Sequence, residues 1–144
     1  MVIYLYHNRV SQNEYIVSDK DADTGSGVYV VNEISKSWLE REGGLLGAEY
    51  DCRLVNRTKT DIYDWTVTLH IDGDYEIDSD WNGQYDTDGS YILVKPMDYN
   101  GTVERDDEQT FGFILHTRGK KEIDSYEISY YRNSDVRQDP FFWI

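Results

Sequence analysis

Apolar side chains alternate with polar ones along most of this chain, at a period of two residues. The clearest run carries its apolar residues at Trp65, Val67, Leu69 and Ile71. Successive side chains of a β-strand point to opposite faces, so this pattern is typical of a strand with one buried face. An amphipathic helix requires a period near 3.6 residues, which these segments lack. The alternation therefore restricts most of the chain to half-buried strands.

Four further segments repeat the pattern. Their apolar sets are Tyr50, Cys52 and Leu54; Tyr91 and Leu93; Phe111, Phe113 and Leu115; and Tyr126, Ile128 and Tyr130. Turn signals rich in Gly, Asp and Asn separate the runs, at residues 72–74, 88–90, 100–101 and 118–120. Short strands at this spacing predict an all-β fold, an antiparallel β-sandwich of immunoglobulin-like or jelly-roll-like type.

The first 44 residues are less regular, and we assign them to an N-terminal extension or linker, with residues 45–144 forming the sandwich. Residues 28–31 fit a strand, and Ser35 to Glu42 fit one helical turn before Gly43-Gly44. The acidic segment 19–27 resembles the start of a calcium loop. Its glycine is one place late and Val30 stands where the bidentate Glu belongs, so we interpret it as a solvated loop.

Charge and residue inventory exclude several function classes. The chain has 28 acidic and 14 basic residues, a formal net charge of −14, which repels nucleic acids and anionic membranes. The single cysteine, Cys52, allows no intramolecular disulfide, and we expect a buried reduced thiol. His70 and His116 fit neighbouring strands, but two ligands do not make a zinc site. We predict no metal, no cofactor and no catalytic residues.

Trp81 stands in a segment, residues 77–90, that is otherwise nearly all polar. Such a neighbourhood offers little apolar surface to bury an indole against. An exposed indole can instead stack on the C–H face of a pyranose ring, while side-chain amides donate to and accept from sugar hydroxyls. Asn82, Gln84 and Asn100 carry such amides, so the sequence points to a neutral glycan as ligand.

A series of short motifs carries a family resemblance over about residues 50–131. The motifs lie at residues 55–58, 64–69, 80–83, 99–103 and 110–113. In order and approximate spacing they resemble those of the family 2 carbohydrate-binding modules, β-sandwiches that bind cellulose or xylan for bacterial polysaccharide-degrading enzymes. The resemblance implies that Trp65 is a core residue and that Trp81 and Tyr99 belong to a strip of three binding aromatics, with Trp38 as the third.

Three departures from the family put the ligand in doubt more than the fold. The family commonly ties its ends with a disulfide, which this chain cannot form. Tyr99 replaces a tryptophan, which reduces the stacking area. The surface is unusually acidic, with Asp78, Asp80 and Asp86 among the residues close to Trp81 in sequence.

The sequence therefore predicts a non-catalytic carbohydrate-binding module for a β-linked polysaccharide such as cellulose or xylan. We expect it to be extracellular or at the cell surface, tethered to a larger secreted or membrane protein. Two alternatives remain open. The apolar segments 1–6 and 141–144 fit an extracellular sensor domain between membrane helices. Tyr99 and the missing disulfide fit a structural surface module with no sugar ligand.

Overall fold

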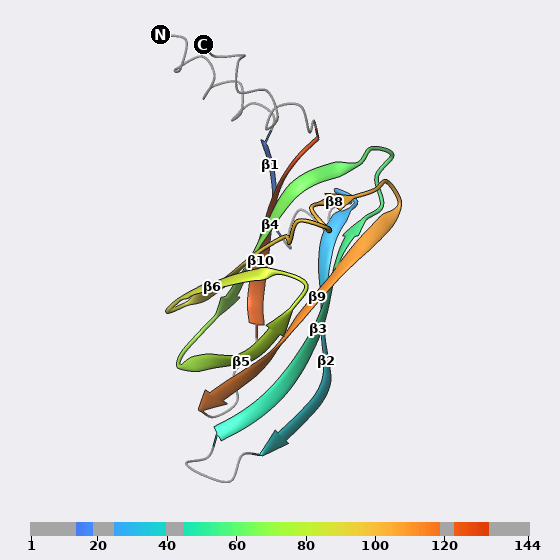
Figure 1. Cartoon of the computed structure of the whole chain (residues 1–144). Helices are drawn as coiled ribbons and strands as arrows, with labels where there is room; N and C mark the ends of the chain where they lie inside the picture. Colours follow the sequence, from blue (N-terminus) through green and yellow to red (C-terminus); the bar gives the residue numbers. More distant parts are fainter. Residues whose placement is uncertain (1–13, 19–24, 40–44, 119–122, 133–144) are drawn as a thin grey trace.

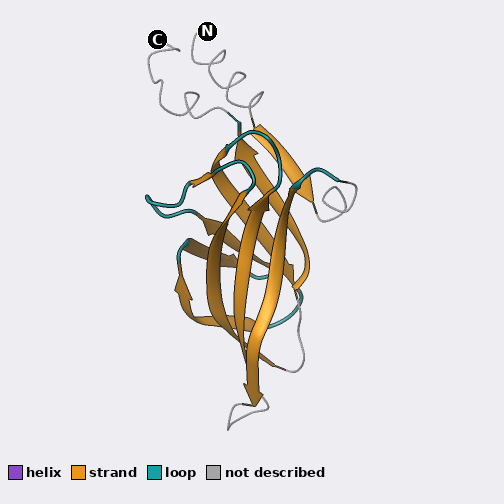
Figure 2. Ribbon diagram, turned by 90° about the vertical axis from the view of Figure 1, so that its right-hand side faces the viewer, coloured by secondary structure: helices purple, strands orange, loops and turns teal. Residues whose placement is uncertain are grey.

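The computed structural model describes residues 14–18, 25–39, 45–118 and 123–132, which form two antiparallel sheets packed face to face (Figures 1 and 2). One sheet has the strand order β1 (Glu14–Ser18), β10 (Ile123–Tyr131), β4 (Ile62–Ile71), β7 (Tyr91–Lys95) and β6 (Gln84–Asp88), with β8 (Thr102–Val103) also paired to β4. The other has the order β2 (Val28–Leu39), β3 (Leu45–Asn56), β9 (Asp107–Arg118) and β5 (Tyr75–Trp81). The predicted all-β antiparallel sandwich is confirmed.

The core lies between the sheets and is built from the alternating residues. Trp65, Phe111 and Phe113 are its largest fully buried side chains. The Trp65 ring stacks on Phe111, with centroids 5.8 Å apart, and its Nε1 donates a hydrogen bond to the Asn100 carbonyl at 2.8 Å. The predicted core role of Trp65 is confirmed. Cys52 is also buried, as expected.

One predicted apolar set faces the wrong way. In β7, Ile92 and Val94 are buried, whereas Tyr91 and Leu93 point outward. All four residues are apolar, so alternation alone does not select the inner pair. The register with β4 selects it, since Ile92 lies opposite the buried Leu69.

The described part of the first 44 residues contributes a strand to each sheet. β1 pairs with β10, and β2 pairs with β3 along its length. The helical turn expected from Ser35 is wrong for residues 35–39, because pairing with β3 overrides the weak local preference. Residues 40–42, the acidic segment at 19–24 and both apolar ends lie outside the described residues.

Candidate functional site

Two tryptophans lie flat on the outer face of the four-stranded sheet, each over a glycine. On β9, Phe111 and Phe113 point into the core, so Gly112 between them faces outward. A Cβ built on Gly112 would lie 2.3 Å from the Trp81 ring. A Cβ on Gly47 would lie 2.2 Å from the Trp38 ring. Only glycine at these positions lets each indole rest directly on the sheet.

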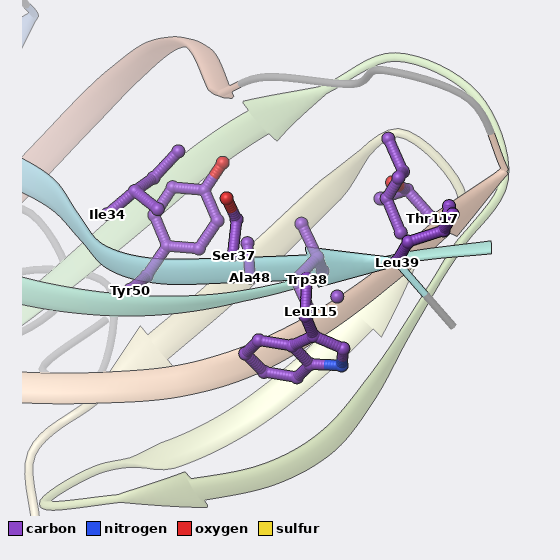
Figure 3. Close-up of a pocket in the computed structure, with 10 residues that line it drawn as sticks. Ile34, Ser37, Trp38, Leu39, Ala48, Tyr50, Leu115 and Thr117 are labelled. Atoms are coloured by element: carbon purple, nitrogen blue, oxygen red, sulfur yellow. The ribbon is translucent and has the colours of Figure 1, made fainter. Parts of the chain in front are cut away.

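The two pairs are arranged diagonally. Trp38 and Trp81 belong to the edge strands β2 and β5, and each lies opposite its glycine on the adjacent inner strand. Gly47 lies opposite His116, four residues along β9 from Gly112. Strand geometry therefore separates the two indoles by about 14 Å. Figure 3 shows the Trp38 indole on the side of the β2–β3 ribbons away from Tyr50 and Ile34. Both indoles are half-buried, so each keeps part of its surface accessible.

The strand end that carries Trp81 is fixed from within the sandwich. The buried hydroxyl of Tyr85 donates to the Gly112 carbonyl at 2.7 Å and lies 3.1 Å from the Trp81 carbonyl. Burial, together with the nearby Cys52 and Asp80, raises the pKa of the Tyr85 phenol far above its usual range. The neutral hydroxyl therefore clamps Trp81 and Gly112 together at all ordinary pH values.

The turn after Trp81 meets the loop after β7. Asn82 has a left-handed backbone, with φ of 57°. Its carbonyl accepts a hydrogen bond from Asn100 Nδ2 at 2.8 Å, and its Oδ1 accepts one from the Tyr99 hydroxyl at 2.7 Å. Tyr99 is 69% exposed. The structure thus brings Trp81, Asn82 and Tyr99 together.

The two remaining predicted amides are both engaged with the backbone. Asn100 is 3% exposed, and its Oδ1 accepts a hydrogen bond from the Met97 amide at 2.7 Å. Gln84 is exposed and donates from Nε2 to the Pro96 carbonyl at 2.8 Å. Asn100 therefore holds the two loops together from inside, whereas Gln84 lies at the surface beside them.

Trp38 has different surroundings. The His116 ring stands edge-on to the indole, with centroids 6.4 Å apart, and His116 Nε2 lies 4.0 Å from a carboxylate oxygen of Asp78. On the opposite side of the sheet here is an open hollow of about 410 Å³ (Figure 3). The exposed side chains of Ile34 and Leu39 help to line it, so the described residues cover the inner side of this sheet end only in part.

Sequence reasoning missed three residues of this face: Gly47, Gly112 and His116. Gly112 did carry a signal, because in a strand with Phe111 and Phe113 inside, a glycine at the outward position leaves space on the sheet. Nothing in the sequence shows which side chain fills that space, since cross-strand register decides it.

The structure separates the two histidines that the sequence placed on neighbouring strands. His70 lies on β4 of the six-stranded sheet and His116 on β9 of the four-stranded sheet, so that placement is wrong. Across the described residues, no three His, Cys, Asp or Glu side chains gather as metal ligands would. No helix suited to crossing a membrane occurs in the same ranges.

Comparison with known families decides the classification. The family model CBM_2, described as "Cellulose binding domain", matches residues 30–129, well over half of the chain. The chain belongs to this family. It is therefore a carbohydrate-binding module, and the resemblance noted in the sequence is confirmed. No curated protein sequence matches it.

Several solved structures share the fold of this CBM_2 module. The chitin-binding domain of Chi18aC from Streptomyces coelicolor is 20% identical with a TM-score of 0.50, covering 67% of this chain and 86% of that one. The chitin-binding domain of a Pyrococcus furiosus chitinase is 22% identical with a TM-score of 0.52, covering 71% and 85%. A GH20 exo-β-N-acetylglucosaminidase from Vibrio harveyi is 18% identical with a TM-score of 0.53, covering 65% of this chain and 13% of the enzyme.

Proposed function

We propose that this module binds a β-1,4-linked polysaccharide on the outer face of the four-stranded sheet, without catalysing a reaction. The observation that carries the proposal is the pair of half-buried indoles lying flat over Gly112 and Gly47 on one sheet face. A flat indole offers its π-face to the C–H groups of a sugar ring. A rigid sheet loses little conformational entropy when the ligand docks.

In this proposal Trp81 is the main stacking platform and Tyr99 extends it. Trp38 contacts the same polysaccharide about 14 Å away. Asn82 and Gln84 would hydrogen-bond sugar hydroxyls, whereas the buried Asn100 would position Asn82 without touching the ligand.

Chitin is the first polysaccharide to test, followed by cellulose and xylan. Two of the solved structures with this fold are chitin-binding domains, and the family model is described by cellulose. These polymers are met outside the cell, so the proposed location is extracellular. The Vibrio harveyi enzyme matches this chain over a small part of its length, which supports a module tethered to a larger protein.

The test is a pull-down of the wild type and of Trp81→Ala by insoluble chitin, cellulose and xylan. Removing a central aromatic anchor costs about 2 kcal/mol or more, so the variant should bind about 30-fold more weakly. Tyr91→Ala, which removes a partly exposed aromatic from the six-stranded sheet, should bind like the wild type. Circular dichroism confirms that each protein folds. Unchanged binding by folded Trp81→Ala would refute this face as the site.

A further inference from the structure

The face that carries the two indoles has an excess of carboxylates. Three ion pairs neutralise part of it: Lys36 with Glu49 and Arg53 with Glu33, each at 3.6 Å, and Arg53 with Glu108 at 3.3 Å. Asp51 faces the same way, because it lies between Glu33 and Gly112 in register. No hydrogen bond or ion pair joins the exposed Asp51 carboxylate to another described residue.

Asp51 lies beside the main platform. It is directly opposite Gly112, and Cβ atoms of opposite residues in an antiparallel pair are about 5 Å apart. The Trp81 ring occupies the space that a Gly112 Cβ would take. The Asp51 side chain therefore stands at the edge of the indole, on the side away from β5.

A sugar stacked on Trp81 would present its ring substituents to this carboxylate. A hydroxyl or acetamide gives an ordinary hydrogen bond there. A protonated amine gives a charge-assisted hydrogen bond, which is roughly twice as strong, and a cation is also attracted to the π-face of tryptophan. The net charge of −14 adds a long-range attraction for polycations, which salt screens.

We propose that this module prefers a cationic aminosugar polymer, such as chitin that has lost part of its acetyl groups, over its neutral counterpart. The preference rests on the proposed stacking of the polymer on Trp81. It is carried by the position of one unpaired carboxylate beside that platform, with Asp51 as the residue that selects the ammonium group.

The experiment compares the affinities of two soluble ligands, a glucosamine hexamer and an N-acetylglucosamine hexamer. Titration calorimetry is run at one mildly acidic pH, where the amines are protonated, and at low and moderate salt. An exposed ion pair contributes at most about 1 kcal/mol. The wild type should therefore bind the glucosamine hexamer about fivefold more tightly than the N-acetylglucosamine hexamer at low salt. In Asp51→Asn the ratio of the two affinities should fall toward one.

Glu127→Gln is the matched control. It removes the same charge from an exposed position on β10, in the six-stranded sheet. It should keep the preference, and an equal fall in both variants would overturn the role of Asp51. Equal affinity of the wild type for the two hexamers would overturn this inference while leaving the proposed function intact. Failure of the folded wild type to bind either hexamer or the insoluble polymers would refute both.

Discussion

The two tryptophan–glycine pairs share one design but differ in what supports them. Trp81 lies over a sheet region clamped from below by the Tyr85 hydroxyl and backed by the core. Trp38 lies at a sheet end whose inner side, among the described residues, is an open hollow, and the edge of the His116 ring packs against its indole. A platform that is already rigid gives up less entropy when a ligand binds. Although both indoles are half-buried, we therefore expect Trp81 to contribute more to binding than Trp38.

The two tryptophan–glycine pairs also fit a module that has no sugar ligand. An aromatic side chain that covers a glycine on a neighbouring strand stabilises the sheet by filling the missing side chain's space. A purely structural module would need both pairs for this reason alone. Measurements that separate binding from stability at the two positions therefore discriminate between the two roles.

The largest expected difference is in binding. Trp81→Ala should lower the affinity for the polysaccharide about 30-fold, as a central anchor does. Trp38→Ala should lower the affinity only about fivefold. A ligand that binds at Trp38 must also order the sheet end beside the hollow, which reduces the net contribution of this contact. Depletion isotherms on the polymer that the wild type binds measure both. Equal losses would show that backing does not matter, and no loss in either would favour the structural role.

The next effect concerns the glycines and is read from thermal or denaturant unfolding. In Gly112→Ala the new methyl group meets the indole where the sheet is clamped, and such overpacking costs about 1–3 kcal/mol. Gly47→Ala should cost less, about 1 kcal/mol, since the sheet end beside the hollow can shift. Gly101→Ala is the control, because a Cβ there has no neighbour closer than 3.8 Å. A larger loss in Gly47→Ala than in Gly112→Ala would contradict the difference in backing.

A third prediction uses the thiol beneath the outer face at the Trp81 end of the sheet. Burial, and to a lesser degree the charge of Asp51, raises the pKa of Cys52 from 9.0 to about 12. Between pH 9.0 and about pH 12 the Cys52 thiol loses its proton in the unfolded chain but keeps it in the folded one, so the free energy of unfolding falls as pH rises. The slope contributed by this group approaches 1.4 kcal/mol per pH unit, by an order-of-magnitude linkage argument.

Denaturant unfolding of the wild type and Cys52→Ala in reducing buffer, from pH 8 to about pH 11, isolates that contribution. The wild type should lose more stability over this window than the variant, because burial, the main cause of the raised tyrosine pKa values, is kept in both proteins. Parallel pH profiles for the two proteins would mean that Cys52 is not as deeply desolvated as the packing shows.

The fold was largely predictable because a single periodicity carries it. Period-two alternation placed Trp65 in the core, and the isolation of Trp81 among polar residues distinguished it from the core aromatics. Sequence failed where contacts between distant strands decide. Trp38 lay in a segment interpreted as a helical turn, and its pairing with Gly47 across a hairpin is invisible in local preference.

The amides show the same limit at finer scale. Asn100 lies in a polar turn, which favours an exposed side chain, yet the structure buries it against the turn after Trp81. The Asn100 side chain hydrogen-bonds the backbone of residues 97 and 82, and only folding brings residue 82 close to it. Side-chain chemistry identified a hydrogen-bonding residue, but it could not show whether the partner is a sugar or the backbone.

The smallest expected effect tests whether Tyr99 belongs to the Trp81 platform through its ring or its hydroxyl. Tyr99→Phe removes an exposed hydrogen bond to Asn82 and keeps the stacking area, so it should weaken polymer binding less than about threefold and cost about 0.5 kcal/mol of stability. Tyr99→Ala should weaken binding more, because the ring itself is lost. If the phenylalanine and alanine variants bind equally weakly, the hydroxyl acts by fixing Asn82 beside Trp81, and the extended platform reduces to Trp81 with its adjacent turn.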